Sequence, residues 1–324
     1  MRVQTRYFVL GASGLLVIGL CTGLFAYFNR GSALAVSVTG PVEMAYVPAD
    51  ASIVGYANVR EVMLSDFRER IRRVAPDGVG QNELQQYLGL NIDQDIDHVL
   101  AFLAPAADSG RPAGLVLFRG RFDTTRLEAA ARSAGGAVST YGDTRIVSAD
   151  LEERGSLAMA FMEPGLVAVG DLTTVQRAVD RGASGAGLLD NPEMSTLLER
   201  IETGSNAWAV GRFDDLSTLG VLPDDVSLRM PAVTAFTASG RVNGGLSGAV
   251  TIEGRDEEAG QNLRDVLRGF MALAKMQTAS EPALQTLLDS LQLGGTGTMV
   301  SMSFRLPSEV LDILFDAAAG DQAH

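Results

Sequence analysis

The sequence predicts an α+β protein, with an N-terminal transmembrane helix followed by a duplicated, mostly antiparallel domain of sheet and helices. Three observations lead to this fold class. Residues 7–28 contain no charged side chain. Beyond them, short runs rich in β-branched and aromatic residues alternate with segments of helical periodicity. That alternation recurs in the same order in the second half of the chain, which is the pattern of a diverged internal repeat.

The apolar run of residues 7–28 has the length of a membrane span. A helix rises about 1.5 Å per residue, so roughly 20 apolar residues cross the hydrocarbon core. Arg2 and Arg6 precede the run, whereas only Arg30 follows it closely. The positive-inside rule therefore places residues 1–6 in the cytoplasm as a short tail and the rest of the chain outside it.

Two alternatives to a retained anchor remain open. Residues 33–35 have the small-x-small form of a signal-peptidase site, and cleavage near Ala35 would release the domain. A signal-peptide apolar region is normally about 7–15 residues, which is shorter than this run. Cys21 ends a lipobox-like sequence and would be lipidated in the second alternative. Gly19 and Gly23 form a GxxxG motif, which would let two helices approach closely as a homodimer.

The composition describes an acidic globular domain. Hydrophobic residues make up 46% of the chain and charged residues 20%, which is typical of folded proteins. With three arginines and no acid in residues 1–30, the remainder carries a formal charge of −16. Such a surface repels phosphate backbones, so nucleic acid is excluded as a partner. Cys21 is the sole cysteine, so the domain has neither a disulfide nor a thiolate nucleophile.

The domain is expected to begin after a small, polar tether at residues 29–49, with a first α+β repeat at residues 50–190. In this repeat we expect strands at 52–59, 98–104, 114–121, 137–141, 145–149, 157–162 and 166–170. We expect helices at 60–75, 81–88, 125–133 and 173–181.

The second α+β repeat is expected at residues 191–320. Its predicted strands are 206–213, 233–240, 245–254 and 299–306, and its predicted helices are 256–275 and 308–317. Adjacent strands in both repeats are joined by tight turns. Such connections indicate mostly antiparallel sheets.

Three segments resemble a known group of proteins. They are PADASIVGYANVR at 48–60, LGLNIDQDIDHV at 88–99 and LVAVGDLTTVQRAVDR at 166–181. Together they resemble uncharacterised bacterial membrane-anchored envelope proteins with an extracytoplasmic domain of unknown function, in order across most of residues 48–200. The resemblance implies the same layout, hence a single-pass protein of the bacterial inner membrane with a periplasmic domain. The group has no established activity, so it assigns no functional residue.

Residues for common catalytic sites are scarce. Only His98 and His324 could supply the imidazole that Ser-His-Asp hydrolysis needs, and a salt bridge with neighbouring aspartates is the simpler interpretation of His98. The sole lysine, Lys275, follows no GxxxxGK sequence, which excludes a Walker loop. The sequence therefore predicts no catalytic residue and no cofactor.

Alternating aspartates make one candidate metal site. Asp93, Asp95 and Asp97 offer the oxygen ligands that calcium prefers. An EF-hand loop, however, needs glycine at its sixth position and glutamate at its twelfth, where this chain has His98 and Ala104. The alternative is a capped turn, in which the Asp side chains accept amide hydrogens.

These observations favour a membrane-tethered, extracytoplasmic, non-enzymatic module that binds or scaffolds an unknown envelope protein or ligand. One alternative is a carrier or sensor of an apolar ligand held between sheet and helices, because antiparallel sheets often keep one face free. The other is a hydrolase that uses only carboxylates, since the 39 acidic residues could supply a catalytic pair.

Overall fold

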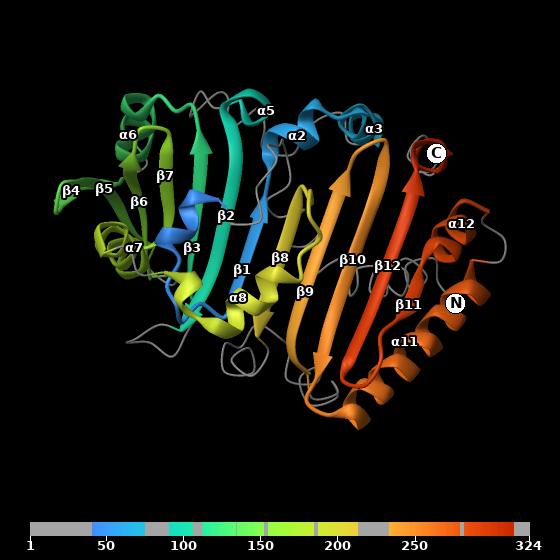
Figure 1. The fold of residues 1–324 in the computed structure, drawn as a ribbon. Coiled ribbons are helices and arrows are strands. Elements are labelled where there is room, and N and C mark those ends of the chain that lie inside the picture. Colours follow the sequence, from blue (N-terminus) through green and yellow to red (C-terminus); the bar gives the residue numbers. More distant parts are fainter. Residues whose placement is uncertain are drawn as a thin grey trace.

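A computed structural model describes residues 41–74, 91–105, 112–133, 135–151, 155–184, 187–212, 233–278 and 282–313. These residues contain twelve strands in a single sheet, ordered β11-β12-β10-β9-β8-β1-β2-β3-β7-β6-β5-β4 (Figure 1). Every pairing is antiparallel. The strands are β1 (Ile53–Ala57), β2 (Ile96–Pro105), β3 (Pro112–Gly120), β4 (Ala137–Tyr141), β5 (Thr144–Leu151), β6 (Gly155–Glu163), β7 (Leu166–Asp171), β8 (Ala207–Arg212), β9 (Val233–Val242), β10 (Gly245–Gly254), β11 (Gln292–Gly294) and β12 (Met299–Pro307).

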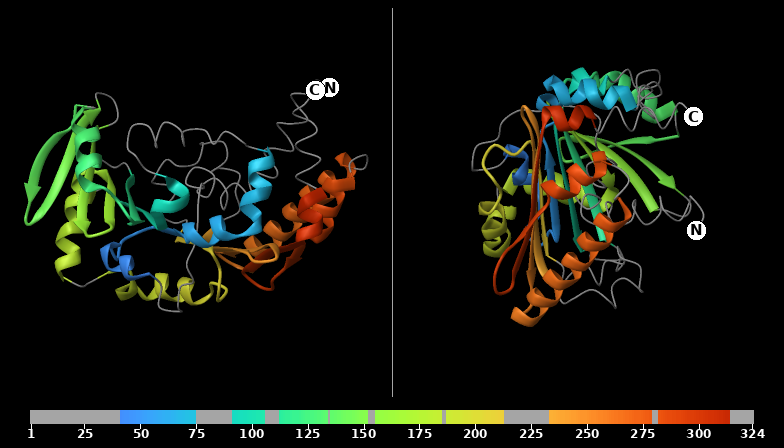
Figure 2. Two further views of the ribbon diagram at one scale, coloured as in Figure 1. Left: turned by 90° about the horizontal axis from the view of Figure 1, so that it is seen from above. Right: turned by 90° about the vertical axis from the view of Figure 1, so that its right-hand side faces the viewer.

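Helices lie on both faces of the sheet (Figure 2). On one face, called here the η1 face, are η1 (Val42–Tyr46), α7 (Leu172–Ser184), η3 (Leu188–Asp190) and α8 (Pro192–Glu199). The opposite side carries α2 (Val59–Leu64), α3 (Asp66–Val74), α5 (Ile92–Asp95), α6 (Thr124–Ser133), α11 (Glu257–Gln277) and α12 (Pro282–Ser290). The sheet is therefore the middle layer of the described chain.

The predicted fold class, a transmembrane helix followed by a duplicated α+β domain, is wrong. Strands from both predicted repeats, 50–190 and 191–320, form one continuous sheet rather than a unit each. No helix in the described part of the chain is long and apolar enough to cross a membrane. The predicted span, residues 7–28, lies outside the described residues, as does the predicted helix at 81–88.

The two halves of the sheet meet at β1 and β8. β1 pairs with β2 on one side, where Ile53 lies opposite Leu103, and with β8 on the other, where Ile53 lies opposite Gly211. Outward from this seam the order β1-β2-β3-β7 is matched by β8-β9-β10-β12. Sequence patterns identify strands but not their partners, which explains why the junction was not predicted.

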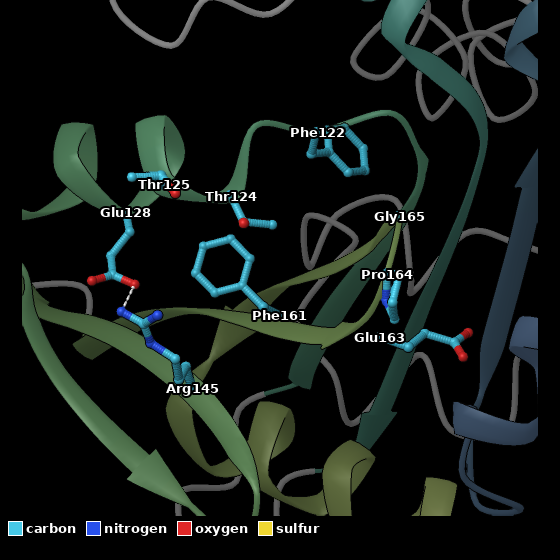
Figure 3. Close-up of a pocket in the computed structure, with 9 residues that line it drawn as sticks. All are labelled: Phe122, Thr124, Thr125, Glu128, Arg145, Phe161, Glu163, Pro164 and Gly165. Atoms are coloured by element: carbon cyan, nitrogen blue, oxygen red, sulfur yellow. Dashed lines mark ion pairs between the residues drawn. The ribbon is translucent and has the colours of Figure 1, made fainter.

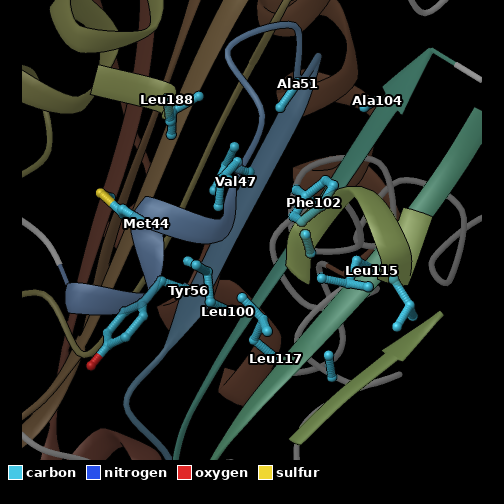
Figure 4. Close-up of a cluster of buried hydrophobic side chains, with 14 of the residues drawn as sticks. Met44, Val47, Ala51, Tyr56, Leu100, Phe102, Ala104, Leu115, Leu117 and Leu188 are labelled. Atoms are coloured by element: carbon cyan, nitrogen blue, oxygen red, sulfur yellow. The ribbon is translucent and has the colours of Figure 1, made fainter. Parts of the chain in front are cut away.

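The main core lies on the η1 face, where alternate residues of the central strands meet η1, α7 and α8 (Figure 4). Its fully buried side chains include Val54 of β1, Leu100 of β2 and Leu117 of β3. Register places Tyr56 opposite Leu100, and Leu100 opposite Leu117, so these side chains share a face. Burial of this apolar surface is the main stabilising contribution to the fold.

The predicted tether at 29–49 overlaps η1. Met44 and Val47 are buried in the core, and Glu43 is only 1% exposed. The segment that directly precedes β1 is therefore packed against the sheet, and its one acidic residue, Glu43, is carried into the interior.

Helix α11 has a capped N-terminus and one face that packs on the sheet. The Asp256 carboxylate accepts a hydrogen bond from Ala259 N at 2.8 Å, which caps the N-terminus. Leu263 faces the sheet in a small cluster with Val300. An apolar stripe on its flank remains exposed in the described structure, and consists of Val266, Phe270, Leu273 and Met276.

The β6–β7 hairpin needs glycine at its turn. Gly165 has φ +76°, and a Cβ there would lie 2.6 Å from Gly120 O. Gly142, in the β4–β5 turn, has φ +56° with nothing within 4 Å. We expect Gly142→Ala to cost about 1 kcal/mol of unfolding free energy, because only the left-handed backbone penalises it. Gly165→Ala should cost about 1 kcal/mol more. Urea denaturation measures both, and equal losses would contradict the clash at Gly165.

Candidate functional site

A pocket of about 510 Å³ lies beside the first turns of α6. Its volume is within the range of roughly 300–1,000 Å³ that small-molecule sites have. The loop before α6, the helix itself, strands β5 and β6, and the β6–β7 turn all contribute to it (Figure 3). The lining residues are Phe122, Thr124, Thr125, Glu128, Arg145, Phe161, Glu163, Pro164 and Gly165. We call it the α6 pocket.

The start of α6 fixes one wall of the pocket. The Asp123 carboxylate accepts a hydrogen bond from Arg126 N at 3.0 Å, so the helix begins at Thr124. Thr124 and Thr125 thus stand in the first helical turn, where Figure 3 shows them above the ring of Phe161. This wall carries hydroxyl groups that can donate or accept hydrogen bonds.

The opposite wall comes from the paired strands β5 and β6. Arg145 and Phe161 lie directly opposite each other in the antiparallel register, so both side chains project toward α6. Phe122 adds a second aromatic ring from the loop (Figure 3). The pocket therefore combines an apolar, aromatic interior with one cationic side chain at its edge.

Glu128 is the buried acid of the pocket. Its side chain is 8% exposed, and its two carboxylate oxygens face two arginines. Arg132 reaches Oε1 at 2.7 Å from one turn further along α6, and Arg145 Nη2 pairs with Oε2 (Figure 3). Both arginine side chains are more than half exposed. Two arginines therefore share one buried carboxylate at this end of the pocket.

The second carboxylate of the pocket, Glu163, is also engaged. Its side chain points away from α6 (Figure 3) and accepts a hydrogen bond from Arg119 Nη2. Arg119 also donates to Pro164 O at 3.3 Å. A glycosidase needs two carboxyl groups flanking the scissile bond, one of them with a proton to give. Ion-paired carboxylates that point in different directions do not provide that arrangement.

On the η1 face, Arg119 also joins a network around the buried Glu43 that we call the Glu43 cluster, formed by Glu43, His98, Arg119 and Glu163. Arg119 Nε donates to Glu43 Oε1 at 2.6 Å, and His98 Nε2 lies 3.0 Å from Glu43 Oε2. Tyr56 lies beside His98, with their ring centroids 5.6 Å apart. The cluster therefore ties η1 to strands β2 and β3.

The environment of Glu43 favours its ionised form. Burial by itself raises the pKa of a carboxyl group, but the hydrogen bond and charge of His98, together with the hydrogen bond from Arg119, outweigh it. The result lowers the pKa of Glu43 from 4.5 to about 2. Burial and the Glu43 charge both raise the pKa of Tyr56, which stays a neutral phenol. The interactions of His98 are those of a structural residue.

The low pKa of Glu43 makes the free energy of unfolding depend on pH in the acidic range. Because its pKa is depressed in the folded state, its contribution is complete above about pH 4.5 and is lost as the pH falls towards about 2. Urea denaturation across this window should therefore show the stability gap between the wild type and Glu43→Gln narrowing with falling pH. A gap that stays constant would contradict the ion pairing of Glu43.

Two of the three aspartates predicted as metal ligands, Asp95 and Asp97, are engaged within the fold. Asp95, at the end of α5, accepts a hydrogen bond from Asn91 N at 2.7 Å. Asp97, on β2, forms an ion pair with Arg60. The side chain of Asp93 lies outside what the structure describes. Among the described residues, no three potential ligands come together to hold a metal.

The sequence did not reveal the α6 pocket. Leu127, the large apolar residue of this helix, is buried. Glu128 is buried beside it, which its charge did not suggest; the only available signal was the i,i+4 spacing to Arg132. His98 pairs with Glu43 rather than with the neighbouring aspartates. The residue His324 lies outside the described residues.

Comparison with known proteins gives little further guidance. No family model matches the sequence. No curated protein matches it either. The chain is similar to a solved structure described as "Structure of crystal form I of TP0453", over 86% of this chain and 99% of that chain, with 11% identity and a TM-score of 0.47. A likeness of this degree carries no argument about fold or function.

Proposed function

We propose that this chain is a non-enzymatic binding module of the cell envelope, and that the α6 pocket is where it contacts its ligand. The proposal rests on a single observation, which is that both carboxylates of the pocket are held in ion pairs. Glu128 is held by two arginines, and Glu163 is paired with Arg119 and turned away. The remaining lining offers aromatic rings and hydroxyls, which are the groups of a binding site.

The side chains of the Glu43 cluster are also engaged within the fold. His98 is joined to Glu43, and Arg119 bridges Glu43 and Glu163. General acid-base catalysis needs a group poised to exchange a proton with a substrate. These groups instead hold η1 and the strands together, which supports a structural role for the cluster and a binding role for the pocket.

A carrier or sensor of an apolar ligand is the second candidate. It is favoured by the position of the α6 pocket, between a helix and the sheet, with Phe122 and Phe161 in its wall. A carrier retains its ligand through mild extraction. Native mass spectrometry of the full-length protein would then show a reproducible mass above that of the bare chain, whereas a clean chain mass would count against a carrier.

Turnover assays test the non-enzymatic role. The full-length protein is incubated with ester, glycoside and peptide substrates, and we expect no rate above that of a Glu128→Gln, Glu163→Gln double variant. A wild-type rate that the double variant lacks would overturn the proposal and would restore the carboxylate-based hydrolase.

We also propose a location at the bacterial inner membrane with the folded domain outside the cytoplasm. The support is sequence alone: the uncharged residues 7–28 and the excess of arginine before them. A reporter that is active only outside the cytoplasm, fused after residue 313, should be active and should sediment with membranes. Reporter activity confined to the soluble cytosolic fraction would contradict this location.

A further inference from the structure

We infer that the α6 pocket takes a small amphipathic anion, with a flat aromatic body placed against Phe161 and Phe122 and one anionic group placed on Arg145. The inference rests on the proposed binding function and adds the chemical class of the ligand. It follows from two features of the pocket, which are its aromatic wall and the partly unused guanidinium at its edge.

The aromatic wall selects the body of the ligand. Phe161 projects from β6 into the pocket beneath Thr124, and Phe122 closes the side towards the loop (Figure 3). Aromatic pairs prefer offset or edge-to-face contacts with ring centroids about 4.5–7 Å apart, which a flat ring in this space can make. The neighbouring hydroxyls of Thr124 and Thr125 can orient a polar substituent.

Arg145 selects the charge of the ligand. Its Nη2 pairs with Glu128, and its other N–H groups make no hydrogen bond to the described residues. Its side chain is 59% exposed, so an incoming anion can reach it. The planar guanidinium presents further donors that match carboxylate or sulfonate oxygens, and charge-assisted hydrogen bonds of this kind are among the strongest in proteins.

The surrounding charge makes this selectivity unusual for the chain. The whole protein has a formal net charge of −13 and repels anions in general. At the α6 pocket, however, Arg132 and Arg145 share one buried carboxylate, Glu128. An anion that binds here gains from the guanidinium of Arg145, because its contact with Glu128 through Nη2 leaves further donors open. A cation of the same shape would meet that guanidinium as a like charge.

Two fluorescent probes that differ by one charged group test the inference. 8-Anilinonaphthalene-1-sulfonate is an aromatic anion, and N-phenyl-1-naphthylamine is its neutral counterpart. With full-length wild-type protein we expect the sulfonate to bind with one-to-one stoichiometry and at least about tenfold more tightly than the amine. Equal affinities, or no binding of the sulfonate, would overturn the inference.

Matched variants locate the site. Arg145→Gln should weaken sulfonate binding roughly tenfold and leave amine binding unchanged. Arg132→Gln is the control: it removes the same charge from the same carboxylate, but Arg132 does not line the pocket, so sulfonate affinity should change less than about threefold. Equal losses in both variants would mean a general charge effect and would sink the inference.

Two further variants separate the pocket from the exposed apolar stripe on α11, which is a second surface in the described part of the chain that a dye can use. Phe161→Leu should weaken both probes several-fold, whereas Phe270→Ser should change neither. The reverse pattern would place the probes on α11 and refute the inference. Catalytic turnover would instead refute the proposed function, and it would leave these binding results standing.

Discussion

Replacing Glu43 by alanine is expected to lower the free energy of unfolding by about 3 kcal/mol. The carboxylate is 1% exposed and holds both Arg119 and His98. Removal of the carboxylate leaves the Arg119 guanidinium and the His98 ring without their partner, next to a cavity. The free-energy cost of leaving such groups unpaired is larger than the net stabilisation that the ion pair provides. Urea or thermal denaturation of the two proteins at neutral pH measures the difference.

An exposed ion pair provides the control for this prediction. Asp50 pairs with Arg177 at 3.1 Å, with side chains 52% and 34% exposed. Asp50→Ala should therefore change stability by no more than about 0.5 kcal/mol, since solvent screens such pairs. If Glu43→Ala were as mild as Asp50→Ala, the Glu43 cluster would not stabilise the fold as its burial indicates.

Leu117→Ala is expected to cost about 3 kcal/mol of unfolding free energy. Leu117 is fully buried in the main core, where it lies opposite Leu100 in the β2–β3 register (Figure 4). Truncation loses the transfer free energy of the side chain and leaves a cavity that the rigid sheet cannot close. Chemical denaturation, fitted with the same m-value for both proteins, gives the change in unfolding free energy directly.

Leu157 on β6 is the matched control, because it is the same residue type in the same sheet but 47% exposed. Leu157→Ala should cost less than about 1 kcal/mol. A similar loss at both leucines would show that strand propensity, rather than burial, sets the effect. It would also contradict the position assigned to the core.

Individual strands could be predicted better than their arrangement. β1 (Ile53–Ala57) lies within the run expected at 52–59, because β-branched and aromatic residues mark a strand whatever its partner. The pairing of β1 with β8 could not be predicted, since hydrogen bonding between strands leaves no residue-specific signature. The same limit led to the expectation of two units where there is one sheet.

The candidate site was beyond prediction for a similar reason. Phe161 and Arg145 face each other only because β5 and β6 pair in one register, and α6 is laid over them by tertiary packing. The burial of Glu43 could not be predicted either, because a glutamate in a polar segment is expected to be exposed to solvent. Its partners, His98 and Arg119, are brought beside it only by the fold. Charges buried in pairs are a property of the fold and not of the local sequence.

The seam between β1 and β8 has a consequence for biosynthesis. β1 and β2 are made early and can pair as soon as both have left the ribosome, but the second edge of β1 stays open until β8 has been translated. During that interval the nascent N-terminal half therefore exposes one edge of β1, whose backbone N–H and C=O groups have no partner strand. Exposed edges of this kind recruit other chains, so a chaperone or rapid onward synthesis has most effect at this stage.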